Sequence, residues 1–235
     1  MYKKNILVTG ASSGIGKYLA IELAKYNFNI ILTSRTKDKL ESTAKEIKQI
    51  GSTCQVITAD LSDKDSINEL YNQTLKIGFI DTVVNNAGFG KFDKLQDVSA
   101  DDWDAQISVN LRAPFLITKL FSQPMIKNKR GMFVYINSVA GKKAYPFSSA
   151  YVSSKFGLRG FTRSIREEFR DYGIKVVSVH PGAVDTGFWD KLDVDFPRHE
   201  MMSSQNVAKT ISHAITVPEN IVLEEIDIQR TAGDF

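Results

Sequence analysis

The sequence predicts an α/β fold, a single-domain Rossmann-type doubly wound parallel sheet of about seven strands with helices on both faces. Short apolar segments alternate with amphipathic segments of helical period along the whole chain. The apolar segments lack polar alternation, as expected for strands buried on both sides of a parallel sheet. A glycine-rich turn joins the first strand to the first helix, as in nucleotide-binding folds of this class.

The elements follow from these patterns in chain order. The first strand is expected at residues 5–9 and is followed by the glycine turn and a helix to about residue 26. Further strands are expected at 28–33, 54–58, 80–84, 132–137, 175–179 and 222–228. Further helices are expected at 37–50, from a cap at Ser62-Asp63 to about 77, and at 99–127, 149–172 and 205–215. Residues 1–235 are expected to form one domain, with the weakly periodic segment 182–204 as a lid or substrate-binding loop.

Composition and charge argue against several classes of function. The 235 residues are 43% hydrophobic, and the small net charge of +3 comes from scattered Lys and Arg residues. Neither a nucleic-acid-binding arm nor a polybasic membrane patch is therefore expected. No apolar run reaches the roughly 18 residues of a spanning helix, and the N-terminus lacks the apolar core of a signal peptide. With Cys54 as the only cysteine, the chain is expected to be cytoplasmic.

A serine, a tyrosine and a lysine suggest proton-transfer chemistry. Tyr151 and Lys155 lie four residues apart, so they share one face of the predicted helix. A neighbouring ammonium group favours the phenolate and is expected to lower the tyrosine pKa from about 10. Ser138, at the carboxyl end of a strand, can hydrogen-bond the same substrate oxygen. Such a group can interconvert an alcohol and a carbonyl if a cofactor carries the hydride, although Tyr-x-x-x-Lys also occurs by chance in many helices.

The turn after the first strand carries Gly10, Gly14 and Gly16. Glycines allow a tight turn and the close approach of a pyrophosphate to N–H groups at a helix N-terminus. The spacing is Gly-x-x-x-Gly-x-Gly rather than the commoner Gly-x-Gly-x-x-Gly. The flanking strand and helix, in the right order, make this turn a nucleotide-binding prediction.

The end of the second strand indicates which dinucleotide is bound. An acidic residue there would bind the ribose hydroxyls of NAD, but this chain has the uncharged Ser34 followed by Arg35. An arginine can pair with the 2′-phosphate of NADP(H), which is therefore the preferred cofactor, while NAD(H) remains an alternative. Ser13 is neutral where a second basic residue would strengthen the case, and Arg35 could instead be a solvated surface charge.

Taken together, these features resemble the short-chain dehydrogenase/reductase family over nearly the whole chain. The motifs that carry the resemblance are Thr9-Gly10-x-x-x-Gly14-x-Gly16, Asp60-Leu61, Asn85-Asn86-Ala87-Gly88, Asn110, Ser138, Tyr151-x-x-x-Lys155 and Pro181-Gly182 with Thr186. They occur in the family's order and spacing. The resemblance implies an NADP-dependent oxidoreductase that acts on a small carbonyl or alcohol substrate.

The resemblance also implies a cofactor site built from residues at the strand ends. The first two strand ends would contribute Gly10, Ser12, Ser13, Gly14, Ile15, Gly16, Ser34 and Arg35. Asp60 would bond the adenine amino group, with the Leu61 backbone beside it. The positions that would line the adenosine and hold the nicotinamide are Asn86, Ala87, Gly88, Pro181, Gly182, Val184 and Thr186.

In the same way, the resemblance implies four catalytic roles. Tyr151 would be the acid in reduction and the base in oxidation. Lys155 would lower the tyrosine pKa and bind the nicotinamide ribose, and Ser138 would position the carbonyl. Asn110 would complete a proton relay through water.

Asn110 lies four residues before Pro114, and a proline cannot donate to the carbonyl at i−4. The freed carbonyl of Asn110 could therefore bind a water that leads to Lys155, although the proline could instead mark a helix kink without catalytic meaning.

Other motif residues also have structural interpretations. Asn85-Asn86 could form a turn, Thr186 and Asp60 could cap helices, and His180 is expected to be structural. No metal site is expected, because the histidines lack ligand spacing.

The aromatic residues near the strand ends suggest a hydrophobic substrate pocket. They are Phe89, Phe92, Tyr145, Phe147 and the aromatic residues of 188–196, although several could be ordinary core or lid packing. The long helices 99–127 and 149–172 are where family members usually dimerise, so a homodimer or homotetramer is expected. Two alternatives remain open, a non-catalytic NADP(H)-binding regulator and an isomerase or dehydratase that uses the same site.

Overall fold

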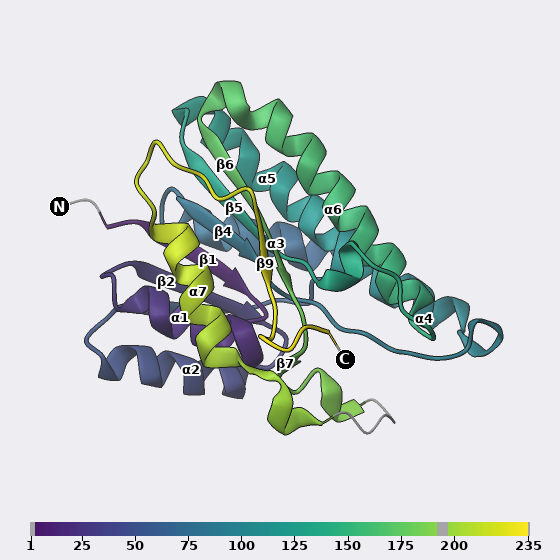
Figure 1. Ribbon diagram of the computed structural model, residues 1–235. Coiled ribbons are helices and arrows are strands. Elements are labelled where there is room, and N and C mark those ends of the chain that lie inside the picture. Colours follow the sequence, from purple (N-terminus) through teal and green to yellow (C-terminus); the bar gives the residue numbers. More distant parts are fainter. Residues whose placement is uncertain (1–2, 192–196, 235) are drawn as a thin grey trace.

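The computed structural model describes residues 3–191 and 197–234, and its centre is a parallel sheet of seven strands (Figure 1). The strands lie in the order β3-β2-β1-β4-β5-β6-β9, and all neighbouring pairs are parallel. They are β1 (Asn5–Thr9), β2 (Asn29–Ser34), β3 (Cys54–Thr58), β4 (Thr82–Asn85), β5 (Gly131–Ile136), β6 (Ile174–Pro181) and β9 (Glu225–Ile228). The predicted fold class and the number of strands in the main sheet are confirmed.

Helices cover both faces of the sheet (Figure 1). One face carries α1 (Gly14–Ala24), α2 (Lys37–Gln49) and α7 (Ser204–Thr216). The other carries α3 (Lys64–Leu75), α4 (Ala100–Ile107), α5 (Ala113–Asn128) and α6 (Ser149–Phe169). None of the helices within the described ranges is long and apolar enough to cross a membrane.

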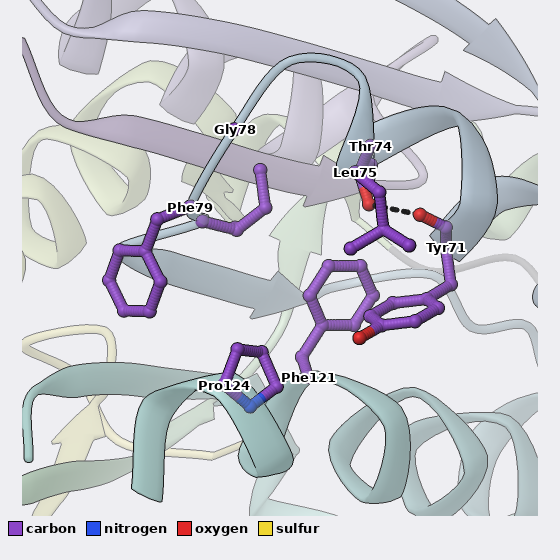
Figure 2. A pocket seen from close by; sticks show the side chains of 8 residues that line it. Tyr71, Thr74, Leu75, Gly78, Phe79, Phe121 and Pro124 are labelled. Atoms are coloured by element: carbon purple, nitrogen blue, oxygen red, sulfur yellow. Dashed lines mark hydrogen bonds between the residues drawn. The ribbon is translucent and has the colours of Figure 1, made fainter. Parts of the chain in front are cut away.

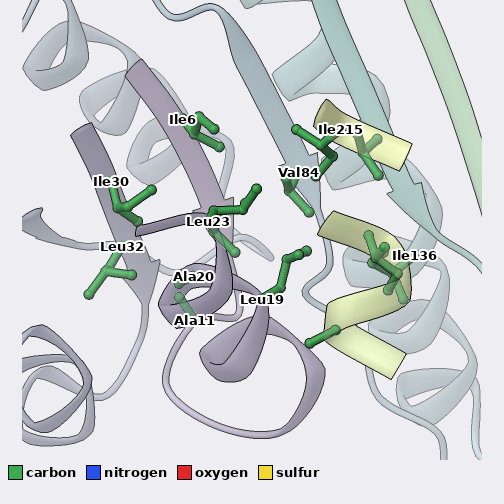
Figure 3. Close-up of a cluster of buried hydrophobic side chains, with 14 of the residues drawn as sticks. Ile6, Ala11, Leu19, Ala20, Leu23, Ile30, Leu32, Val84, Ile136 and Ile215 are labelled. Carbon is green, nitrogen blue, oxygen red and sulfur yellow. The ribbon is translucent and has the colours of Figure 1, made fainter. Parts of the chain in front are cut away.

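Alternate residues of the central strands enter two separate apolar clusters. Ile6 and Val8 of β1 belong to the cluster under α1 and α7, whereas Leu7 belongs to the cluster on the other face. Figure 3 shows the first cluster, to which α1 contributes Leu19 and Leu23. Burial on both faces explains why the strand segments are almost uniformly apolar.

The predicted helix over residues 99–127 is wrong as a single element. A π-helical segment, Ser108–Arg112, separates α4 from α5. Pro114 lies in the first turn of α5 and has no N–H for the carbonyl of Asn110, so a wider turn fits here. The other predicted elements of the main fold agree with the structure within three residues at each end.

The predicted lid segment 182–204 contains short elements that its sequence pattern did not indicate. β7 (Val184–Asp185) pairs in parallel with β8 (Met202–Ser203), and 3-10 turns lie at Trp189–Lys191 and Arg198–Glu200. The Arg198 guanidinium donates to the carboxylates of Asp185 at 2.8 Å and Asp190 at 2.6 Å. Whether the segment covers a substrate remains a prediction.

A buried arginine joins α6 to the edge of the sheet. Arg166 is 7% exposed and donates through Nε to the Val176 carbonyl at 3.2 Å and through NH2 to the Glu224 carbonyl at 2.7 Å. Pairing between β6 and β9 begins only at Ser178, so Arg166 supplies a donor where β9 does not.

We expect Arg166→Met to lower the free energy of unfolding by about 1–3 kcal/mol, because the buried Val176 carbonyl loses its donor and the Glu224 carbonyl keeps only the N–H of Ser178. The matched control is Arg163→Met on the same helix, where the side chain is 54% exposed and pairs with Glu225. The control should cost less than about 1 kcal/mol. Urea unfolding monitored by circular dichroism measures both, and equal losses would contradict the role given to Arg166.

Candidate active site

Four neighbouring strands bring the predicted site residues to one edge of the sheet. β1, β4, β5 and β6 are adjacent and parallel, so their carboxyl ends meet at the same edge (Figure 1). The glycine turn follows β1, Asn86 follows β4, Ser138 follows β5, and Gly182 follows β6. The strand order reverses between β1 and β4, and ligands of open α/β sheets bind at such a reversal.

The glycine turn has the backbone that its sequence requires. Gly10 and Gly14 have φ angles of +64° and +54°, a left-handed conformation that favours glycine. A Cβ atom on Gly14 would lie 3.2 Å from Cγ2 of Thr186, so the segment after β6 reaches the turn. Ser13, the exposed N-cap of α1, makes no capping bond through its side chain, and the first turn of α1 contains no acidic residue. These features suit an anion at the N-terminus of α1.

Asn86 holds this turn in place. Its side-chain Nδ2 donates to the Thr9 carbonyl at 2.8 Å, and its backbone N–H donates to Thr9 Oγ1 at 2.9 Å. The N–H of Ala87 donates to the same hydroxyl oxygen at 3.0 Å. A Cβ atom on Gly16 would clash with Asn86 Nδ2, which explains why glycine stands there. The Asn86 amide therefore binds the protein's own backbone.

The ends of β2 and β3 place a cation beside a carboxylate. Arg35 is exposed, and no hydrogen bond or ion pair of its side chain occurs within residues 3–191 and 197–234. The Asp60 carboxylate accepts from the N–H and hydroxyl of Ser62 at 2.9 and 2.7 Å. Burial alone would raise the pKa of Asp60, but the Ser62 bonds and the Arg35 charge lower it overall. Ser34 is half-buried, Leu61 is buried, and the cap of α3 is Asp63 rather than Asp60.

Ser138, Tyr151 and Lys155 are brought together as predicted. The Ser138 side chain lies beside the Tyr151 hydroxyl and acts on its pKa as a hydrogen-bond partner, and Ser138 Oγ accepts from the N–H of Ala140 at 3.1 Å. Lys155 Nζ lies 5.6 Å from the centre of the Tyr151 ring and donates to the Ile136 carbonyl at 3.0 Å. Lys155 is 4% exposed, so its charge lies inside the protein.

The expectation that Lys155 lowers the pKa of Tyr151 is wrong for this arrangement. Burial raises the pKa of the Tyr151 phenol to about 12, and the Ser138 hydrogen bond offsets only part of that increase. Burial likewise lowers the pKa of Lys155 to about 8. In both cases removal from water favours the neutral form. At pH 7 the tyrosine therefore keeps its proton, and the lysine is still mostly charged.

Asn110 lies in the π-helical segment and is 1% exposed. Its Oδ1 accepts from the N–H of Phe89 at 3.0 Å, and its Nδ2 donates to the Phe89 carbonyl at 2.9 Å and to Ser154 Oγ at 3.1 Å. A Cβ atom on Gly88 would lie 3.1 Å from Asn110 Oδ1 and 3.7 Å from Lys155 Nζ, so Asn110 lies near Lys155. The water relay remains a prediction. Sequence reasoning missed Ser154, because one serine among several beside Lys155 gives no distinguishing signal.

Two phenylalanine rings pack against Tyr151. The ring centre of Phe92 lies 5.6 Å and that of Phe188 lies 5.5 Å from the Tyr151 ring, and the two phenylalanines are 6.0 Å apart. Trp189 packs on Phe188 at 5.4 Å. Of the other predicted pocket residues, Phe147 is 60% exposed and Tyr145 hydrogen-bonds Asp234. The backbone of Phe89 is hydrogen-bonded to the Asn110 side chain. Phe196 lies outside the described residues.

The segment after β6 contains the remaining predicted cofactor positions. Pro181 ends β6, and the Gly182 N–H donates to the Ile228 carbonyl at 2.8 Å. A Cβ atom on Gly182 would clash with the side chain of Gln229, a contact that the sequence did not indicate. Val184 is buried in β7, and Thr186 Oγ1 accepts from the N–H of Phe188 at 3.2 Å instead of capping a helix.

An apolar pocket of about 310 Å³ lies at the other end of the sheet (Figure 2). It is lined by residues from the end of α3, the segment before β4 and the second half of α5, namely Tyr71, Thr74, Leu75, Gly78, Phe79, Ile80, Phe121 and Pro124. It contains none of the predicted site residues. Within residues 3–191 and 197–234, no group of three or more His, Cys, Asp or Glu side chains is arranged to hold a metal ion.

Comparison with known sequences agrees with this geometry. The family model for short chain dehydrogenases matches residues 4–195. A sepiapterin reductase from Chlorobaculum tepidum is 35% identical over 241 residues, and the match covers 99% of this chain and 98% of that protein.

Comparison with solved structures gives the same result. An alcohol dehydrogenase from the archaeon Thermococcus sibiricus, complexed with 5-hydroxy-NADP, superposes with a TM-score of 0.91 at 28% identity, and the match covers 98% of this chain and 97% of that one. A metagenomic short-chain oxidoreductase in complex with NADP superposes with a TM-score of 0.86 at 32% identity and 97% coverage of each chain. From the site geometry and the match over residues 4–195, the chain belongs to the short-chain dehydrogenase family.

Proposed function

We propose that the protein is an NADP(H)-dependent oxidoreductase that reduces a ketone or aldehyde, or oxidises the corresponding alcohol. The observation that carries this proposal is the juxtaposition of Ser138 and Tyr151 at the carboxyl edge of the sheet, where the serine side chain acts on the pKa of the tyrosine. Lys155 lies one helical turn from the tyrosine. The glycine turn lies at the same edge and suits the pyrophosphate of a dinucleotide.

In the reductive direction, the side chains of Tyr151, Ser138 and Lys155 carry out the proton transfer. A nicotinamide cofactor, when bound, would supply the hydride to the carbonyl carbon. Tyr151 holds its proton at neutral pH and donates it to the carbonyl oxygen, which completes the alcohol. Ser138 hydrogen-bonds the same oxygen, and the charge of Lys155 stabilises the tyrosinate that is left. In oxidation the same steps run in reverse, with Tyr151 as the base.

The residues present fit a bound NADP(H). The α1 N-terminus would receive the pyrophosphate beside Ser12, Ser13 and Ile15, and the positively charged Arg35 would meet the 2′-phosphate. Asp60, Leu61, Ala87 and Gly88 would line the adenosine, while Pro181, Gly182, Val184 and Thr186 would hold the nicotinamide. The NADP and 5-hydroxy-NADP complexes of two related structures support this choice. Asn110, which lies near Lys155, would hold the water of the proton relay that leads to Lys155.

The presence of both Tyr151 and Lys155 argues against the regulator, because a non-catalytic relative has no need to keep the pair. Consumption of one NADPH for each substrate reduced would separate the reductase from a regulator and from an isomerase or dehydratase.

The aromatic cluster supports an apolar, ring-containing substrate. A carbonyl oxygen at Ser138 and Tyr151 would place the rest of the substrate against Phe92 and Phe188.

We also propose that the protein forms a homodimer or homotetramer through the face of α4, α5 and α6. This face exposes Trp103, Phe115 and Phe156, at 36%, 44% and 44%.

We expect Tyr151→Phe to lower kcat for NADPH-dependent reduction by at least about 10³-fold, because the proton donor is removed. The dissociation constant of NADPH should change less than about twofold, since the ring and its packing remain. Steady-state kinetics and fluorescence titration measure the two quantities. The matched control is Tyr172→Phe, at a half-exposed tyrosine beyond the end of α6. Undiminished turnover in Tyr151→Phe would overturn the catalytic assignment.

We expect wild-type protein to bind NADPH at least about tenfold more tightly than NADH, a difference of about 1.4 kcal/mol. Arg35→Ala should remove this difference by weakening NADPH alone, because only NADPH carries the 2′-phosphate. Calorimetric titration of both cofactors is the measurement. Lys48→Ala, at an exposed lysine in the last turn of α2, controls for the loss of one positive charge. Equal affinities in the wild type would mean that Arg35 does not read the ribose.

We expect aryl carbonyl compounds to show kcat/KM values at least about tenfold above those of alkyl carbonyls of similar size, because ring contacts add about 0.5–1.5 kcal/mol each. Phe188→Ala should remove most of this preference. Phe147→Ala should keep it, because that ring is 60% exposed and lies outside the cluster at Tyr151. A panel of matched aldehydes and ketones tests the preference, and a stronger effect of Phe147→Ala would place the pocket elsewhere.

A further inference from the structure

One buried histidine beside the site is not used in the proposed chemistry. His180 lies next to the end of β6 and is 0% exposed. Burial lowers its pKa to about 4, so the imidazole is neutral near pH 7. A neutral buried imidazole needs a partner for each ring nitrogen, one as donor and one as acceptor.

The two contacts of His180 fix its tautomer. Nδ1 lies 3.2 Å from the carbonyl oxygen of Ser138, and Nε2 lies 3.1 Å from Ser178 Oγ. A carbonyl oxygen can only accept, so Nδ1 must carry the hydrogen. Nε2 is then unprotonated and accepts from the Ser178 hydroxyl. Both ring nitrogens are engaged by these two partners, so this geometry gives His180 no part in proton transfer.

The same contact limits the movement of Ser138. The Ser138 carbonyl accepts from His180 Nδ1–H and from the N–H of Gly141 at 2.9 Å. The Ser138 N–H donates to Asn137 Oδ1 at 2.9 Å. His180 comes from the neighbouring strand, whereas Gly141 and Asn137 belong to the same loop as Ser138. The Asn137 N–H joins the start of this loop to β6 by donating to the Val179 carbonyl at 2.8 Å, and His180 adds a side-chain donor from β6 to Ser138 itself.

We propose that His180 is a positioning residue that holds the Ser138 backbone, so that the Ser138 hydroxyl stays directed at the oxygen shared with Tyr151. This inference rests on the proposed function. A catalytic hydroxyl that is free to shift loses most of its benefit in the transition state, while ground-state binding changes little. Loss of His180 should therefore affect kcat rather than KM.

Two substitutions at this position test the role. His180→Ala removes the donor and should lower kcat by about tenfold, with KM and the NADPH dissociation constant within about twofold. His180→Asn keeps an amide donor near the position of Nδ1 and should restore kcat to within about threefold of wild type. The matched control, His213→Asn, makes the same change at an exposed residue of α7 and should have no effect. Melting temperatures show whether each variant is folded.

The outcomes separate this inference from the proposed function. If Tyr151→Phe abolishes the wild-type activity but His180→Ala leaves kcat unchanged, the inference about His180 is overturned and the proposed function is not. A fall in both His180 variants without rescue would also overturn it, because a purely structural role predicts that result. Nitrogen-15 NMR of the wild-type imidazole provides a test that needs neither activity nor a stable variant. We expect a protonated Nδ1 and an unprotonated Nε2 at pH 7, and the opposite tautomer would overturn the inference.

Discussion

The hydrogen bonds between the ends of β1 and β4 are the interaction on which the rest of the site depends. Thr9 Oγ1 receives two backbone N–H groups from the chain after β4, and the Asn86 amide returns to the Thr9 carbonyl. These bonds join the two strands at the point where the strand order reverses. Because the crossovers leave this point in opposite directions, a crevice forms beside it. Thr186, from the segment after β6, lies against Gly14 beside this junction.

Burial then decides the protonation states at the other side of the crevice. Tyr151 and Lys155 are both shifted toward their neutral forms, and the shift of the tyrosine is opposite to the one that their spacing suggested. Spacing along a helix gives distance, but desolvation depends on what covers the groups. Here Phe92 and Phe188 pack on Tyr151, and Lys155 turns toward the Ile136 carbonyl. A protonated tyrosine is the form that reduction of a carbonyl requires.

The sequence predicted those features that follow from local patterns. β3 begins and ends at the predicted residues, 54 and 58, and Ser138, Tyr151 and Lys155 meet because strand ends and helical spacing determine their positions. The π-helical segment at Ser108–Arg112 was not predicted, because its apolar pattern continues through it. The binding of the Asn86 side chain to the glycine turn was not predicted either. It depends on a contact between residues more than seventy positions apart, which no local pattern records.

The polar groups of this site are held mainly by backbone atoms. Lys155 donates to the Ile136 carbonyl, Asn110 bonds both polar backbone groups of Phe89, and His180 lies against the Ser138 carbonyl. A backbone partner is present whatever side chain stands at its position, so neighbouring residues can change without breaking these bonds. This explains in physical terms how chains that share about a third of their residues or less keep the same fold, with TM-scores of 0.86 and 0.91. The geometry depends on the few polar side chains that reach the backbone, and the apolar residues around them need only preserve the packing.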